Sequence, residues 1–223
     1  MKTIKFSDKI KEAAPNLKVV QIEADVVNPP TSDALWGEIE AEAEKLAGEY
    51  EISQINKRPA ILATRNAYKA LGKDPNRYRP SAEALCRRIV NEKGIYRLTT
   101  LIDAINLLSI ATGYSIGGFD MDKIQGDTLT LDRGKHEDEF YGIGRGQLNI
   151  DGLPVYRDAK GGIGTPTSDE ERTKLTPDTT HLLMLVNIYG EDMSAEDTAE
   201  YARQILERHA SLSRFEYRVV TVE

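Results

Sequence analysis

The sequence contains few residues of the kinds that build metal and redox sites. Cys86 is the single cysteine among 223 residues, so the chain cannot form an internal disulfide or a site with several thiolate ligands. The three histidines, His136, His181 and His209, are far apart in the sequence and show no metal-ligand spacing. We therefore expect the protein to bind no metal ion and no other cofactor.

Long hydrophobic runs and common catalytic motifs are missing as well. No apolar segment approaches the roughly 20 residues that cross a bilayer, and residues 1–15 lack the apolar centre of a signal peptide. The patterns GxxxxGK[ST], GxSxG and HExxH are absent. The glycine-rich stretches GIGRG and GGIG do not follow a strand and open a helix, as a dinucleotide site requires. We expect a cytoplasmic globular protein without membrane contact.

Positive charge is scarce overall but is concentrated in one segment. The chain has a formal charge of −7 and a pI near 5.2, which argues against a general nucleic-acid binder. Between Lys57 and Arg97, eleven basic residues face three acidic ones, which gives this basic segment a charge of +8 and leaves −15 for the rest. Such segregation can create a local field that attracts phosphate groups. The alternative is a solvated pair of helices whose charges pair with acids elsewhere in the fold.

The hydrophobic pattern changes along the chain from helical to extended. The predicted elements are a strand over 16–28, helices over 33–50, 58–72, 82–93 and 100–112, short strands and a hairpin at Asp151–Gly152 after residue 126, a long polar connection over 160–178, a buried strand over 181–189, a helix over 195–210 and a final strand over 214–222. Helices that are followed by strands favour an α+β fold over a βαβ repeat.

Residues 100–126, TLIDAINLLSIATGYSIGGFDMDKIQG, join a buried helix to a glycine-rich and acidic stretch. Thr100 and Asp103 predict a capping box at the start of the helix, and Gly113 predicts its end. The pair Gly117–Gly118 has two interpretations. Without Cβ atoms, these residues either form a pocket wall that a ligand or neighbouring backbone can approach closely, or make a tight corner with positive φ.

Three stretches of the chain resemble a known family. RPSAEALCRRI followed by LTTLIDAINLLSIATGYSIGGFDMDKIQGDTLTL is similar to the B3/4 domain of the bacterial phenylalanyl-tRNA synthetase beta chain, and TPDTTHLLMLV resembles that family's threonine turn and following strand. The residues in matching places are Asp103, Asn106, Phe119, Asp120, Asp122, Lys123 and Gly126. The remainder of the sequence is similar to free-standing members of the family, with the family core over 79–223 and a strand and helices over 1–78 packed on it, in a single domain spanning 1–223.

The resemblance implies a layered, mixed β-sheet core with flanking helices, and a pocket. In the synthetase that pocket hydrolyses tRNA wrongly charged with tyrosine, so the resemblance implies binding of tRNA or aminoacyl-tRNA and hydrolysis of the mischarged form in trans, without ligase activity. Guanidinium groups suit phosphate oxygens, and the candidate RNA-binding residues are Arg65, Arg79, Arg87 and Arg88. The candidate pocket residues are Asn106, Ser115, Gly117, Gly118, Asp120 and Thr180.

Two departures from the family pattern bear on catalysis. The chain has Gly117–Gly118 where the bacterial family has histidine, and Leu185 or a neighbour where it has glutamate. The backbone N–H groups of the two glycines are candidate donors to a developing oxyanion, but the sequence assigns no general base. Three functions stay open: an RNA-binding module, a hydrolase of mischarged aminoacyl-tRNA, and a non-catalytic protein that binds a small molecule or amino acid in the retained pocket. The sequence leaves the oligomeric state undetermined.

Overall fold

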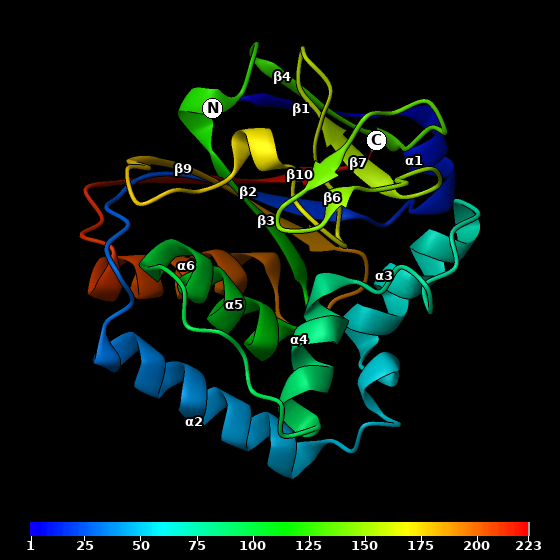
Figure 1. Ribbon diagram of the computed structural model, residues 1–223. Helices are drawn as coiled ribbons and strands as arrows, with labels where there is room; N and C mark the ends of the chain where they lie inside the picture. Colours follow the sequence, from blue (N-terminus) through cyan, green and yellow to red (C-terminus); the bar gives the residue numbers. More distant parts are fainter. Residues whose placement is uncertain (223) are drawn as a thin grey trace.

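The computed structural model describes residues 1–222, which form two stacked β-sheets and a layer of helices (Figure 1). The central sheet has the strand order β10-β2-β9-β3, from Arg214–Thr221, Lys18–Asp25, His181–Ile188 and Ser115–Asp120, and all its pairs are antiparallel. The outer sheet has the order β1-β4-β7-β8, from Thr3–Phe6, Thr128–Arg133, Pro154–Arg157 and Gly162–Gly164. Because β1 pairs parallel with β4 and the other pairs are antiparallel, this sheet is mixed. The predicted α+β fold with a layered sheet core is confirmed.

Helices cover the face of the central sheet that is turned away from the outer sheet. Figure 1 shows α5 (Thr100–Thr112) and α6 (Ala195–His209) directly beneath this sheet, with α2 (Asp33–Glu49) outermost. The helices α3 (Pro59–Ala70) and α4 (Ser81–Val90) lie at one end of this layer, and α4 contacts both α5 and β3. The remaining short elements are α1 (Asp8–Ala13), η1 (Ile55–Lys57), η2 (Met121–Lys123), β5 (Tyr141–Gly142), β6 (Gly146–Gln147) and η3 (Glu171–Thr173).

Burial on both faces explains the continuous apolar run of β9. Leu182, Met184 and Val186 pack among the helices, whereas Leu183 and Leu185 pack against the outer sheet. Each fully buried aliphatic side chain of this kind stabilises the fold by roughly 1.5–3 kcal/mol. This run is therefore enough to predict β9 from the sequence alone, and the predicted bounds of 181–189 agree with the structure to within one residue.

Side-chain caps begin three of the six α-helices, and two of these caps, Ser32 and Ser194, are the predicted ones. The hydroxyl groups of Ser32 and Ser194 accept hydrogen bonds from the N–H groups of Leu35 and Asp197, and Gly113 ends α5 with a φ of +73°. The capping box at Thr100 and Asp103 is wrong. Thr99 is the N-cap of α5 and makes no side-chain cap, while the Asp103 carboxylate accepts from the Leu98 N–H and the Thr31 hydroxyl. Asp103 thus ties the segment before α5 to the segment after β2.

Two turn predictions need correction. Gly117 and Gly118 lie in strand β3 and do not have positive φ, so the tight-corner interpretation is wrong. Asp151–Gly152 does form a turn, with a φ of +79° at Gly152, but the strand that pairs with β7 is β4 and not the run just before the turn. The Gly152 N–H donates to the Gly134 carbonyl, so the turn closes against the end of β4.

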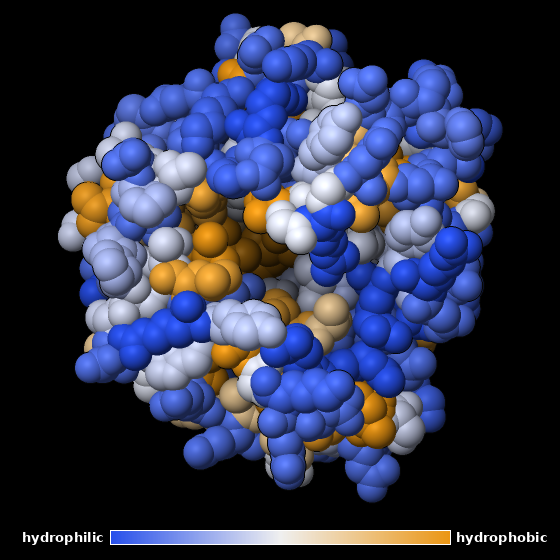
Figure 2. Space-filling view, in the orientation of Figure 1, coloured by the Kyte–Doolittle hydropathy of each residue, from blue (hydrophilic) through white to orange (hydrophobic). Residues whose placement is uncertain are grey.

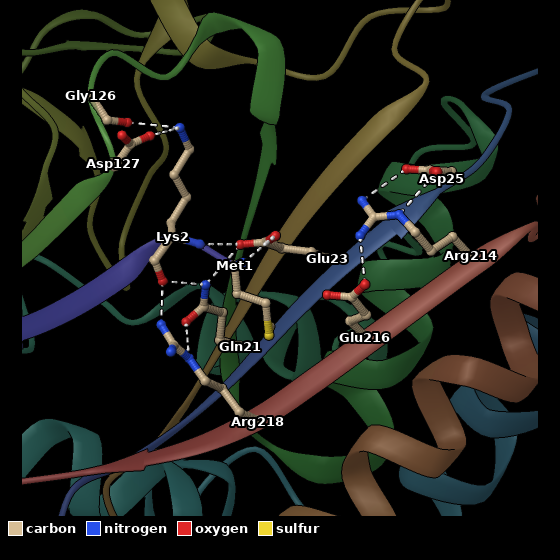
Figure 3. A network of polar contacts seen from close by, with 10 residues as sticks. All are labelled: Met1, Lys2, Gln21, Glu23, Asp25, Gly126, Asp127, Arg214, Glu216 and Arg218. Atoms are coloured by element: carbon tan, nitrogen blue, oxygen red, sulfur yellow. Dashed lines mark hydrogen bonds and ion pairs between the residues drawn. The ribbon is translucent and has the colours of Figure 1, made fainter.

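Strand β1 and helix α1 have no counterpart among the predicted elements, because four residues of alternation are too short a signal. A polar network explains why β1 is held in place (Figure 3). Glu23 is buried on β2 and accepts from the Lys2 N–H at 2.6 Å, while the Gln21 side chain donates to the Lys2 carbonyl at 2.8 Å. The Lys2 ammonium reaches the Gly126 carbonyl and Asp127, just before β4. The residue before β1 therefore joins the two sheets through partly buried hydrogen bonds to β2 and exposed contacts beside β4.

Within residues 1–222, no helix combines the length and the apolar character that a membrane crossing requires. The longest helix, α2, carries an exposed acidic face along its outer side and buries Leu35, Ile39 and Leu46.

Two glycine-to-alanine substitutions should move stability in opposite directions. A Cβ at Gly134 would lie 2.1 Å from the Ile150 carbonyl oxygen, so Gly134→Ala should destabilise the fold by about 1–3 kcal/mol through overpacking. A Cβ at Gly37 in α2 meets nothing within 4 Å, so Gly37→Ala should stabilise by roughly 0.5–1 kcal/mol. Urea unfolding of both variants checks this, and equal shifts for the pair would contradict the packing around Gly134.

Candidate functional site

A cavity of about 270 Å³ opens between α4, α5, β3 and the segment 165–175. Figure 2 shows the surface hollowed near its centre, with apolar walls and a rim of mixed apolar and hydrophilic residues. The lining residues are Ser81, Leu85, Leu98, Ile102, Ile105, Asn106, Ser109, Ile116, Gly118, Ile143, Asp169, Lys174 and Leu175. An apolar pocket with a few polar groups converging on it is the usual form of a small-molecule site.

Strand β3 positions one wall of this cavity. It is the edge strand of the central sheet, so its second edge is open to other partners. Gly118 faces α5, where a Cβ would lie 2.3 Å from the Ile105 Cδ1 atom and 3.2 Å from the Leu175 Cδ1 atom. Glycine at this position therefore allows α5 to pack closely on the strand and keeps the cavity wall free of a side chain.

Asp169 is the titratable group whose environment in the cavity is most unusual. Its Oδ2 atom accepts a hydrogen bond from the Gly118 N–H at 3.2 Å, on the open edge of β3. Desolvation raises the pKa of Asp169 to about 7, and the Gly118 N–H offsets only part of this rise. The side chain lies deep among protein atoms and keeps some accessible surface because it lines the cavity. A carboxyl group with a pKa near neutrality can both accept and release a proton at physiological pH.

Other polar groups of the cavity are partly occupied by the fold. Burial raises the pKa of Asp103, and the Thr31 hydroxyl, the Leu98 N–H and the nearby Asn106 amide offset part of this rise. The Ser109 hydroxyl donates to the Tyr114 carbonyl at 2.7 Å. Lys174 lines the opposite wall and forms an ion pair with Glu171. Asn106, Lys174 and the hydroxyl of Ser81 are thus candidate hydrogen-bond donors to a ligand in the cavity.

The structure brings two of the six predicted pocket residues, Asn106 and Gly118, to this cavity. Ser115 and Gly117 belong to the opposite side of β3, where a Cβ at Gly117 would lie 2.6 Å from the Phe119 ring. Asp120 caps η2 through the Asp122 N–H and pairs with Lys123 at 3.0 Å, as expected for turn chemistry. Thr180 is exposed at the start of β9, away from the cavity.

The four candidate RNA-binding arginines occupy different environments. Arg65 is buried, and its guanidinium donates to Glu83 at 2.8 Å, to the Pro75 carbonyl and to Asn76. Arg79 and Arg87 lie 3.4 and 4.0 Å from the same carboxylate. Arg88 is turned the other way and stacks 4.7 Å from the centre of the Tyr96 ring. Three of the four therefore surround one buried acid, Glu83, with a local excess of positive charge.

Part of the basic segment stabilises the fold instead of facing solvent. Arg58 is buried and donates to the carbonyl groups of Ile110 and Ala111 at the end of α5, where positive charge is favoured by the helix dipole. Lys73 is buried as well and donates to the Asn149 and Asp151 carbonyls. The +8 charge of this segment is therefore only partly available to a ligand.

Comparison with known proteins assigns the fold to a family. The sequence model of the B3/4 domain matches residues 63–221. The chain belongs to the B3/4 domain family. A solved structure that is similar is an N-terminal fragment of the phenylalanyl-tRNA synthetase beta-subunit from Pyrococcus horikoshii, with 15% sequence identity, a TM-score of 0.47 and coverage of 97% of this chain. The chain spans 50% of the length of that fragment. No curated protein sequence matches the chain.

In this B3/4 domain, Asp169 is the site residue that sequence reasoning misses. It lies in the polar stretch TPTSDEERTK, which the sequence predicts only as part of a long connection that is either flexible or functional. The structure orders this stretch through β8, η3 and a bidentate pair between Arg172 and Asp158 at 2.9 and 3.0 Å. No local pattern marks Asp169, because its partner Gly118 is 51 residues away in the chain.

Removal of the Arg65 side chain should mainly affect stability. Arg65→Met leaves Glu83 buried with weaker partners, so we expect a loss of about 3 kcal/mol in the free energy of unfolding, at the low end for broken buried pairs. Arg88→Met is the matched control on a more exposed arginine and should change stability by less than about 0.5–1 kcal/mol. Urea unfolding measures both. Equal effects would contradict a structural role for Arg65.

The raised pKa of Asp169 predicts a specific pH dependence of stability. The folded state keeps the proton up to about pH 7, whereas the unfolded state loses it near the ordinary pKa of 3.8. Stability should therefore fall as pH rises from about 4 to about 7. Asp169→Asn should remove this part of the decline, and Asp178→Asn, an exposed control at the end of the same connection, should keep it. Identical pH profiles for the wild type and Asp169→Asn would contradict the assignment.

Proposed function

We propose that this B3/4 domain binds aminoacyl-tRNA and hydrolyses the ester that joins the amino acid to the terminal ribose. The observation that carries the proposal is Asp169, a carboxyl group with a pKa near 7 on the wall of an apolar cavity. The cavity volume of about 270 Å³ is near the lower end for small-molecule sites and suits an amino-acid side chain.

In the proposed reaction, the Asp169 carboxylate accepts a proton from a water molecule as the water oxygen attacks the ester carbonyl carbon. The negative charge that develops on the carbonyl oxygen needs a donor, and the side-chain amide of Asn106 is a neutral donor on the cavity wall. The ester C–O bond then breaks, and Asp169 returns the proton to the departing ribose oxygen. The products are a free amino acid and a tRNA with an intact hydroxyl group.

The two glycine N–H groups suit the oxyanion role less well than their sequence suggests. The Gly118 N–H already donates to Asp169. Because consecutive N–H groups of a strand point to opposite edges, the Gly117 N–H points toward its partner strand β9. Neither glycine N–H group is therefore free to donate to an oxyanion. This favours a second candidate function, in which the cavity binds an amino acid without hydrolysis and the Asp169 carboxylate pairs with the ammonium group of that amino acid. Stabilisation of the protein against heat by free amino acids, with no deacylation, would select that alternative.

Asp169→Asn separates the two roles. If Asp169 is the general base, the variant should lose about 10²- to 10⁴-fold in the rate of deacylation while it retains affinity for the charged tRNA. The wild-type rate should rise with pH through about 7 and then level off, as the carboxylate form becomes populated. The measurement is release of amino acid from a panel of charged tRNAs, beginning with tyrosyl-tRNA.

The matched control is Asp178→Asn, which changes an exposed acid on the same connection and should leave the rate unchanged. Loss of activity in both variants would point to general charge effects. Full activity in Asp169→Asn would exclude Asp169 as the base.

A further inference from the structure

We propose that a second pocket, which we call the arginine pocket, binds a phosphate group of the tRNA. The aminoacylated end of the same tRNA enters the cavity. The pocket is defined by Arg77, Arg79 and Arg145 and has a volume of about 320 Å³. This inference rests on the proposed function in that it concerns the same RNA, but it is tested by a separate measurement.

The lining of the arginine pocket is cationic. Its residues are Arg77, Tyr78, Arg79, Ala84, Arg145, Leu148, Asn149, Ile150, Leu153, Thr165 and Thr167. Three guanidinium groups are present and no carboxylate is among these lining residues. Guanidinium groups offer a planar fork of donors that matches the oxygens of a phosphate. The charge of the pocket is thus opposite to that of the whole protein, which has a net charge of −7.

Two of the three guanidinium groups are not neutralised by the fold. Within residues 1–222, no acidic side chain forms an ion pair with Arg77 or Arg145, and both residues are exposed. Arg77 lies 5.8 Å from the centre of the Tyr78 ring, a contact that leaves its donors free for an anion. Arg79 shares Glu83 with Arg65 and Arg87, so one buried carboxylate faces three arginines and leaves positive charge beside the pocket.

The floor of the arginine pocket is apolar. Leu148, Ile150 and Leu153 form it, and the last two are buried. An apolar floor lowers the local dielectric and strengthens the attraction between the arginines and an anion. It also provides a surface for the sugar or base that accompanies a nucleotide phosphate. The volume is larger than an isolated phosphate requires, which favours a nucleotide unit over the free ion.

The arginine pocket and the cavity share their walls. The loop before α4 contributes Arg79 to the arginine pocket, and the first residue of α4, Ser81, lines the cavity. The turn between β5 and β6 contributes Arg145 and Ile143 in the same way. On the 165–175 segment, Thr167 lines the arginine pocket and Asp169 lines the cavity, two residues further on. Three separate segments thus line both the arginine pocket and the cavity. An RNA strand whose attached amino acid lies in the cavity would therefore place its nearest phosphates beside the arginines.

The double variant Arg77→Gln/Arg145→Gln tests the assignment. Its affinity for uncharged tRNA, measured by fluorescence anisotropy, should fall about tenfold or more, and the slope of log affinity against log salt should decrease by about one for each phosphate that the variant no longer binds. For charged tRNA the variant should raise KM with little change in kcat, because the arginines bind the phosphate equally in the ground and transition states. Arg203→Gln on α6, a partly exposed arginine that lines neither pocket, is the control and should bind tRNA as the wild type does.

Small probes separate this inference from the proposed hydrolysis. Tyrosine ethyl ester has no phosphate, so the double variant should cleave it at the wild-type rate. If neither the ester nor charged tRNA is cleaved by the wild type, the hydrolase proposal fails, while the tRNA affinities still decide the role of the arginines. Unchanged tRNA affinity and salt slope in the double variant would overturn the inference. Stabilisation of the wild type but not of the double variant by AMP, without tRNA binding, would also overturn it and assign the pocket to a free nucleotide.

Discussion

The open edge of β3 is the constraint on which the candidate site depends. An edge strand exposes N–H and C=O groups that need partners, and here the 165–175 segment supplies them. Asp169 accepts from the Gly118 N–H, and Lys174 forms an isolated bridge with Phe119 on the same strand. These contacts hold the segment beside β3, where it forms one wall of the cavity. The position of Asp169 at this sheet edge also buries its carboxyl group. The resulting desolvation raises the pKa of Asp169, and the hydrogen bond from the Gly118 N–H offsets part of that rise.

A buried acid has a comparable organising role in the basic segment. Glu83 lies on α4 with almost no exposed surface, and arginines from α3, from the loop before α4 and from α4 itself approach it. An unpaired carboxylate at this depth would be costly, so at least one arginine must stay with it. Arg65 fills that structural role, which leaves Arg79 to face the arginine pocket. The positive charge of the basic segment is therefore divided between arginines that stabilise the fold and arginines that face the surface. Composition alone does not show which arginine has which role.

Elements marked by local signals can be predicted from the sequence, whereas sites that depend on contacts between distant segments cannot. Helices α2 and α6 are predictable because a serine cap and an apolar stripe lie within a few residues of each other. Strand β9 is predictable because burial on both faces leaves a continuous apolar run. Asp169 and Arg145 carry no such signal, since their surroundings are assembled from segments that are distant in the sequence. The sequence assigns Arg65 to RNA for the same reason, because its partner Glu83 becomes visible only in the fold.

The departures from the family pattern acquire a physical meaning in this fold. A side chain at Gly118 would collide with Ile105, so histidine there would require α5 to move away from the sheet. Leu185 and its neighbours Met184 and Val186 are all buried among apolar side chains on either face of β9. A glutamate at any of these three positions would be desolvated and would lack a charged partner. The proposed hydrolysis in this chain must therefore draw its proton acceptor from the other edge of β3, which is the edge that Asp169 occupies.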